Sequence, residues 1–175
     1  GKIVLPVELA RQLRLETGEA VASGSGVIDV SFKGSGRSPG GTLTGLSGSG
    51  SYRIEGLEVA RIDVPAFKRA AASASDGEGL TAAFEALRAG GALALGDASG
   101  SITIVNGVAA LSPIRNSTAD ADARVTSIAE LGQGTIDTSI ILTIRGQVQR
   151  AAMEISFAGS PQALELKKTL IAAGA

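Results

Sequence analysis

Apolar and polar residues alternate along much of the chain with a period of two, which is the period of a β-strand with one buried face. The stretches with the clearest alternation are residues 28–32, 121–125, 136–144 and 153–157. Asn106-Gly107 joins two further apolar runs, and this dipeptide is the strongest two-residue signal for a β-hairpin. The pattern therefore predicts a sheet of roughly eight strands.

Two segments break the alternation. Glu55-Gly56 separates the strand-like residues 52–54 from 57–59, so we expect two short strands that meet at a tight turn. Near the C-terminus, residues 159–161 combine Gly, Ser and Pro and are expected to end a strand. A short helix is then predicted around residues 169–172.

Apolar residues three or four positions apart predict three short helices. The first follows Pro6 and carries Leu9 and Leu13 on one side. The second begins after Asp63, whose carboxylate is expected to cap the first backbone N–H groups of the helix. The apolar faces of the second and third helices consist of Val64, Phe67, Ala71 and Ala74, and of Leu80, Ala83, Phe84 and Leu87.

These elements predict one domain over residues 1–175 that is mainly β with a few short α-helices, an α+β fold. The sheet is expected to be antiparallel, twisted and meander-like. The second and third helices are expected to be inserted mid-chain and packed on one face of the sheet. No regular alternation of helices and strands supports a parallel sheet.

The composition narrows the chemistry available to such a fold. The chain has no cysteine and no histidine, which removes thiolate nucleophiles, zinc sites with imidazole or sulfur ligands, and histidine-based triads. Hydrophobic residues make up 44% of the chain but aromatic residues only 3%, so bases and sugars find few stacking platforms. The 16 basic residues are scattered among 17 acidic ones, which disfavours nucleic acid as a partner.

Two groups of residues invite a ligand-binding interpretation. The glycine-rich residues 34–41 include Arg37 and could cradle a phosphate, but no Gly-Lys-Ser/Thr element follows them, which favours a flexible linker. Asp120 and Asp122 could bind a hard cation. Solvated outward positions explain these two acids better, because their neighbours alternate with small apolar residues.

Catalysis is the weakest interpretation of the chain. Ser73, Lys68 and Lys168 show no spacing typical of a Ser/Lys hydrolase. A glycosidase with two opposed carboxylates ranks last, because the chain has one Tyr and no Trp to hold a sugar. We therefore expect no catalytic residue, no cofactor and no metal, and hence no enzyme.

Three passages from residue 27 onward combine strands with glycine-rich turns in an order that is typical of one family. They are residues 27–39 with the Leu-Ser-Gly-Ser-Gly of 46–50, residues 52–64 with their entry into a helix at Ile62-Asp63, and residues 136–144 with the closing turn and strand of 157–166. Together they resemble the C-terminal region of the AsmA family of bacterial envelope proteins. The family commonly has Gly two residues before its Ile-Asp dipeptide, where this chain has Ala60.

The resemblance implies a periplasmic part of a protein anchored in the inner membrane of a Gram-negative bacterium, with a role in outer-membrane assembly. Larger relatives are thought to form long β-grooves that conduct phospholipids between membranes. The chain would then be a fragment of a longer protein, with Gly1 as a remnant of cloning, and would associate with a membrane only through parts absent from it. Its partners would be phospholipid or other envelope proteins.

The strand predicted at residues 136–144 links this implied function to particular side chains. Ile136, Ile140, Leu142 and Ile144 share one face of it. That face would either contact lipid in a groove or pack into a core against the helices. The competing function is a purely structural or protein-interaction domain that pairs through its edge strands.

Overall fold

The computed structural model describes residues 1–34, 37–73, 76–145 and 150–174, and over these residues ten strands form one antiparallel sheet. The strands are β1 (Lys2–Glu8), β2 (Ala22–Lys33), β3 (Ser47–Ala60), β4 (Ala92–Val105), β5 (Val108–Leu111), β6 (Ile114–Ser117), β7 (Ala121–Glu130), β8 (Thr135–Ile144), β9 (Arg150–Ser160) and β10 (Ala163–Gly174). The helices are α1 (Leu9–Gln12), α2 (Pro39–Thr44), α3 (Val64–Ala72) and α4 (Gly77–Arg88). The predicted mainly β class with an antiparallel sheet and a few short helices is confirmed.

Strands that follow one another in the chain are neighbours across most of the sheet. The order is β1-β2-β3-β4-β5-β7-β8-β9-β10, and β6 pairs with β7 at a position beyond β5. The sheet is therefore open, with β1 at one edge and β10 at the other. The predicted hairpin at Asn106-Gly107 is confirmed, because both residues have the positive φ of a tight hairpin turn, 49° and 76°.

A line of irregular pairing crosses β2, β3 and β4. The register shifts next to Gly24 in β2 and next to Gly56 in β3, and Gly96 of β4 lies opposite the second shift. The three glycines have φ values of 134°, 62° and 71°, which residues with a side chain rarely adopt. Because bulges bend strands and increase their twist, this line curves the first half of the sheet.

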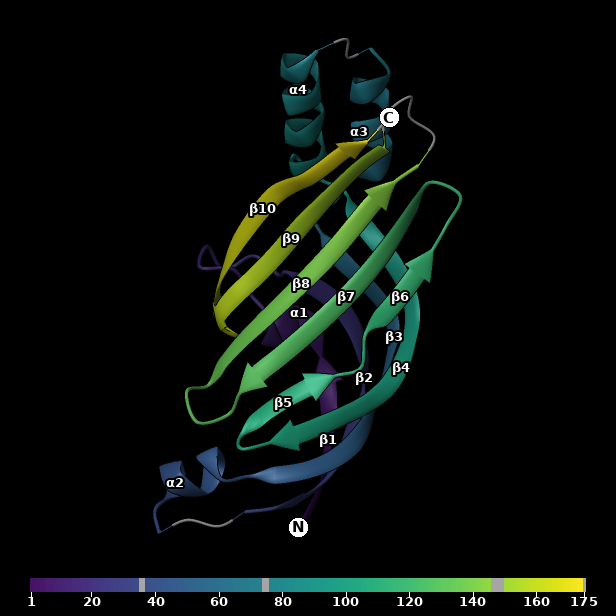
Figure 1. The fold of residues 1–175 in the computed structure, drawn as a ribbon. Helices are drawn as coiled ribbons and strands as arrows, with labels where there is room; N and C mark the ends of the chain where they lie inside the picture. The colour runs from purple at the N-terminus through teal and green to yellow at the C-terminus, as the bar shows by residue number, and fades with distance from the viewer. Residues whose placement is uncertain (35–36, 74–75, 146–149, 175) are drawn as a thin grey trace.

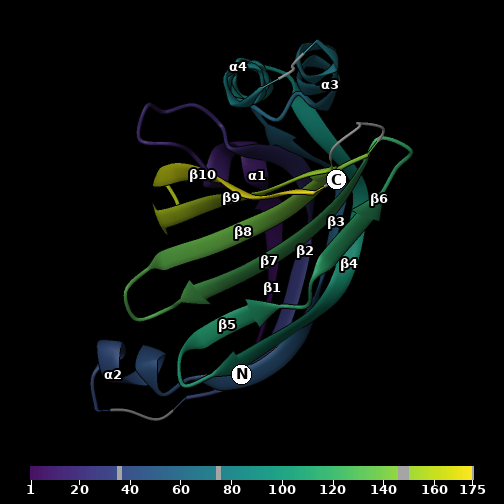
Figure 2. The same cartoon turned by 45° about the horizontal axis from the view of Figure 1, so that its top comes forward.

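The curved sheet places two layers of strands face to face, with the hydrophobic core between them (Figures 1 and 2). In Figure 1, β1–β3 lie behind and β7–β10 in front, while β4 curves along the side. The most deeply buried side chains of the front layer are Ile140, Leu142 and Ile144 in β8 and Met153 and Ile155 in β9, each exposed by 1% or less. The core is thus formed by the sheet against itself.

Helices lie at both ends of these layers (Figure 1). At one end, Phe67 of α3 meets Phe84 of α4 edge to face, with ring centroids 5.4 Å apart, and Phe67 and Leu87 are fully buried in the common core. At the other end, α2 lies beside the β4–β5 hairpin, where Gly107 N donates to Leu46 O at 2.8 Å. The pair α3 and α4 therefore covers one end of the space between the layers.

Two local predictions are wrong, and two strands were not predicted. Residues 169–172 form no helix: they belong to β10, which pairs with β9. Glu55-Gly56 makes no turn between two strands: it is a bulge inside the single long strand β3, and Gly56 N donates to Asp97 Oδ1 at 3.0 Å. In both cases pairing with a neighbouring strand outweighs the local signal. The strands β1 and β6 were not predicted at all.

Candidate functional site

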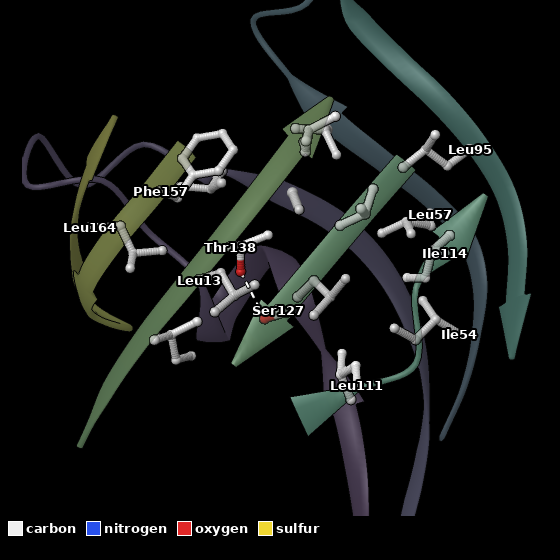
Figure 3. A pocket seen from close by; sticks show the side chains of 17 residues that line it. Leu13, Ile54, Leu57, Leu95, Leu111, Ile114, Ser127, Thr138, Phe157 and Leu164 are labelled. Carbon is white, nitrogen blue, oxygen red and sulfur yellow. Dashed lines mark hydrogen bonds between the residues drawn. The ribbon is translucent and has the colours of Figure 1, made fainter. Parts of the chain in front are cut away.

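The main candidate site is an apolar cavity of about 110 Å³ between the two layers. Its walls come from both layers, with Ile54 and Leu57 of β3 facing Phe157 of β9 and Leu164 of β10 (Figure 3). The remaining lining residues are Leu9, Leu13, Val21, Ala22, Val59, Leu95, Leu111, Ile114, Val125, Ser127, Ile136, Thr138 and Ile140. An apolar wall of this kind attracts hydrocarbon and offers no group for acid–base chemistry.

Ser127 and Thr138 are the polar side chains among the residues that line the cavity. They lie on the adjacent strands β7 and β8, and their hydroxyl oxygens are 2.8 Å apart (Figure 3). One of the two hydroxyls donates to the other, so both oxygens have a hydrogen-bond partner within the wall. The pair therefore adds little polarity to the wall.

One side of the cavity is closed by residues 13–21, which connect α1 to β2 and which we call the strap. The strap lies against the start of β10 through three backbone hydrogen bonds: Arg14 N to Pro161 O at 2.8 Å, Leu164 N to Arg14 O at 2.9 Å, and Glu16 N to Leu164 O at 3.3 Å. Leu13 of the strap and Leu164 of β10 both line the cavity. This contact line, which we call the seam, therefore forms part of the cavity wall.

Side chains extend the seam in both directions. Gln162 Nε2 donates to Arg11 O at 3.0 Å and to Gln12 O at 3.1 Å. Beyond Leu164, the ammonium of Lys168 donates to Arg61 O at 3.0 Å. Burial, with the nearby charges of Arg88 and Arg61, lowers the pKa of Lys168 to about 8, while Glu85 opposes this shift.

The face predicted at residues 136–144 points between the layers. Ile140, Leu142 and Ile144 are buried in the core, and half-buried Ile136 lines the cavity together with Ile140. Core packing is therefore what the structure shows at Leu142 and Ile144. Ile136 and Ile140 are the members of this face that a ligand in the cavity could touch.

Asp63 lies at the N-terminus of α3, where its Oδ1 accepts a hydrogen bond from Ala66 N at 2.9 Å. This is the geometry of a helix N-cap. Ala74, expected on the apolar face of the same helix, lies outside the described residues. So does part of the glycine-rich stretch 34–41, in which Ser38 Oγ accepts from Gly41 N at 3.0 Å and caps α2.

The other polar residues singled out in the sequence are engaged in separate pairs and hydrogen bonds. Lys68 Nζ donates to Asp120 Oδ1 at 2.6 Å, and Asp122 is paired with Arg145. Ser73 Oγ donates to Ala70 O at 3.2 Å within its own helix. Across the described ranges no three or more Asp or Glu residues are placed to hold a metal ion.

Sequence reasoning missed the strap, the seam and Lys168 as parts of a site. Leu13 and Leu164 are separated by most of the chain, and no local pattern connects them. The signal that did exist was the alternation around β10, where Leu164, Leu166 and Lys168 fall on one face. A strand that continued past residue 166 would put Lys168 on the same face as Leu164, which lies at the seam.

No family model, no curated protein and no solved structure matches this chain. Among the described helices, none has the length and hydropathy needed to cross a membrane.

Proposed function

We propose that this chain is a non-catalytic periplasmic module of an AsmA-like, inner-membrane-anchored protein involved in outer-membrane assembly, and that it holds part of a phospholipid acyl chain between its layers. The family and the location rest on the sequence resemblance of residues 27–166. The observation that supports the lipid is the apolar cavity beneath the strap. The absence of cysteine and histidine from the sequence favours the non-catalytic interpretation.

The size of the cavity limits what it takes up. Small-molecule sites usually measure roughly 300–1,000 Å³, while an engineered apolar cavity of about 150 Å³ takes one benzene. At about 110 Å³, the cavity accommodates only a short length of one acyl chain. A longer length enters only if the strap separates from β10.

The seam is suited to such an opening because few bonds hold it. β8 and β9 are paired over nine residue positions, whereas three backbone hydrogen bonds join the strap to β10 in the described part of the chain. Segments with few backbone bonds and little buried surface open locally at much lower free energy than core strands. The strap is therefore the wall through which we expect a chain to enter.

A cavity-filling variant tests the proposal. Ala22 lines the cavity, and Ala22→Leu adds hydrocarbon where the acyl chain would lie. The protein is incubated with vesicles of phosphatidylethanolamine and phosphatidylglycerol, isolated again and analysed by native mass spectrometry. We expect wild type to carry phospholipid and Ala22→Leu to carry much less.

Ala92→Leu is the matched control, because Ala92 is exposed at the start of β4. This variant should carry as much phospholipid as wild type. Equal loading of wild type and Ala22→Leu, or no loading of any of the three proteins, would contradict the proposal.

A second function is favoured by the edge strand β1, which could pair with another β-strand. Gly1 N donates to Phe32 O, and Phe32 N donates to Gly1 O. Because hydrogen-bonded positions alternate along an antiparallel pair, the backbone N–H and C=O groups of the odd-numbered residues of β1 point toward β2. The backbone groups of Lys2 and Val4 therefore point away from β2. Val4 is 57% exposed, and Ile3 and Leu5 are also exposed. Sedimentation velocity over a range of concentrations tests whether this edge pairs between copies, and Val4→Lys should abolish any such association.

A further inference from the structure

Three cationic side chains converge where the seam ends. Arg61 follows β3, Arg88 is the last residue of α4, and Lys168 lies on β10. Lys168 Nζ donates to Arg61 O at 3.0 Å, and Arg61 N donates to Gly91 O, just beyond α4, at 3.0 Å. Three elements that are distant in sequence are thereby held together, and we call these three side chains the cationic cluster.

The cluster has more positive than negative charge. Arg61 Nη2 lies 2.7 Å from Glu19 of the strap, and Arg88 Nη1 lies 3.7 Å from Glu85 of α4. Lys168, in contrast, has no carboxylate within 4.0 Å among the described residues. Lys168 therefore makes no close ion pair of its own in the described part of the chain, and Glu85, which pairs with Arg88, is the acid whose charge also acts on it.

The conformation of Arg61 is unusual. Its φ of 59° lies in the left-handed region, which residues other than glycine seldom adopt. The bonds to Gly91 and Lys168 hold it there, and they point its carbonyl oxygen at the ammonium group of Lys168. Backbone strain of this kind is concentrated at ligand-binding and switch positions.

The cluster continues the wall of the cavity. Leu164 of β10 lines the cavity, and Lys168 lies on the same face of that strand. Val59 of β3 also lines the cavity, and Arg61 lies just past the end of that strand. At a rise of about 3.3 Å per residue, Lys168 lies about 13 Å along β10 from Leu164. A molecule with a hydrocarbon tail in the cavity and a polar head along the seam would therefore place its head near the cluster.

We propose that Arg61, Arg88 and Lys168 bind the anionic group, carboxylate or phosphate, of an amphiphile whose acyl chain occupies the cavity beneath the strap. This inference rests on the proposed function, because it needs the tail to enter the cavity. The anion supplies the close ion pair that Lys168 lacks in the described part of the chain, and the guanidinium groups offer paired N–H donors that suit both carboxylate and phosphate. The strap participates through Glu19, which an incoming anion would displace from Arg61.

The test compares two probes with the same tail, decanoate and decanol. Binding to the full chain is measured by calorimetry, and the methyl NMR signals of Leu13 and Leu164 report whether the tail reaches the cavity. We expect decanoate to bind about tenfold more tightly than decanol, since a hydrogen bond to a charged group is worth this much when it is partly shielded from water.

Two variants locate the anionic group. Lys168→Met should weaken decanoate about tenfold and leave decanol unchanged. Arg88→Gln should have a smaller effect of the same kind, and it does not break the bond between Lys168 and Arg61. Lys167→Met is the matched control, because Lys167 is exposed on the opposite face of β10 and its loss removes the same charge.

The dependence on pH separates a specific role of Lys168 from a structural one. The charged groups that surround Lys168 are Arg61, just past β3, and Arg88 and Glu85 of α4. Arg61 is in turn paired with Glu19 of the strap. Since decanoate stays ionised above about pH 6, its affinity for wild type should be constant from about pH 6 to about pH 8 and fall above that, as Lys168 loses its proton. The affinity of Lys168→Met should not change over that range.

The outcomes distinguish this inference from the proposed function. If both probes shift the methyl signals but bind equally well, and Lys168→Met changes neither affinity, the anion site is wrong and the acyl cavity remains. If neither probe binds or shifts the signals of Leu13 and Leu164, the proposed function fails, and the anion site with it.

Discussion

The two edges of the sheet are protected in different ways. At β10, the strap supplies backbone hydrogen-bond partners to Pro161 and Leu164. Farther along the same strand, Lys168 Nζ donates to Arg61 O. At β1, protection comes from one side chain: Gln12 Oε1 accepts from Glu8 N at 3.1 Å, and Gln12 Nε2 lies 3.5 Å from Pro6 O. One edge is therefore covered by a segment of the chain, and the other only by an amide group.

The two edges therefore suit different partners. An unprotected strand edge with exposed apolar side chains attracts another strand, which suits β1 to protein contacts. The covered edge lies over the cavity, and its cover is held by few bonds, which suits it to admit a small apolar molecule.

The largest expected effect is a difference between two leucines, one at each edge. Leu164→Ala removes a side chain that is 2% exposed and should lower the free energy of unfolding by about 2–4 kcal/mol. Leu5→Ala, at the β1 edge, removes a side chain that is 45% exposed and should change it by less than about 1 kcal/mol. Urea unfolding monitored by circular dichroism measures both. Similar losses in the two variants would show that the edges are equally well packed.

Two helix N-termini extend the comparison to the elements beside each edge. Asp63→Ala removes the cap of α3, at the end of the layers near the seam, and should lower the free energy of unfolding by about 1 kcal/mol. Glu8 precedes α1 near β1 and makes no side-chain cap, so Glu8→Ala should leave stability nearly unchanged. Thermal melts of both variants check this prediction, which an equal loss of stability would contradict.

Two glutamines test the protection of each edge directly. Gln12→Ala should increase concentration-dependent association in sedimentation experiments, because it frees the backbone groups of Pro6 and Glu8. Gln162→Ala should leave association unchanged and speed hydrogen exchange at the backbone amide of Leu164, because it loosens the seam. Each substitution should cost about 1 kcal/mol or less in stability. If both variants associate to the same extent and exchange the amide hydrogen of Leu164 at the same rate, the proposed difference between the two edges is wrong.

The last prediction concerns the titration of Lys168, whose effect on stability depends on pH. Its pKa is lowered to about 8 in the folded chain from 10.5, so between these values the unfolded chain binds more protons than the folded one. The free energy of unfolding of wild type should therefore rise relative to that of Lys168→Met as the pH increases from about 8 to about 10.5. Urea unfolding of both proteins across this range provides the measurement. A constant difference would show that Lys168 is not penalised by burial and by its cationic neighbours.

Features set by short-range signals could be predicted from the sequence. The hairpin at Asn106-Gly107 requires positive φ at both residues, and Asn and Gly are the residues that adopt it most readily. The cap at Asp63 and the strand at residues 136–144 likewise depend on neighbouring positions. The class of the fold followed from such signals.

Features set by pairing between distant residues could not be predicted. A positive φ at Gly56 suits a turn as well as a bulge, and only the neighbouring Asp97 of β4 shows which one forms. Residues 169–172 have no strict alternation, and pairing with β9 makes them a strand. The cavity combines Leu13 with Leu164, which meet only after the sheet has curved. The fold class was therefore predictable, and the site was not.

The central claim is that an acyl chain enters the cavity when the strap leaves β10, and a disulfide across the seam tests it most directly. Leu15 and Leu164 form a parallel β-bridge, and Glu16 and Glu165 each follow one of these residues in the chain. Because the chain has no cysteine of its own, a disulfide between these two positions would be the only one. Decanoate binding to fully oxidised Glu16→Cys/Glu165→Cys is compared with binding to the same protein after reduction. We predict that the oxidised form loses binding and that reduction restores it. Equal binding by the oxidised and reduced forms would contradict entry through the seam.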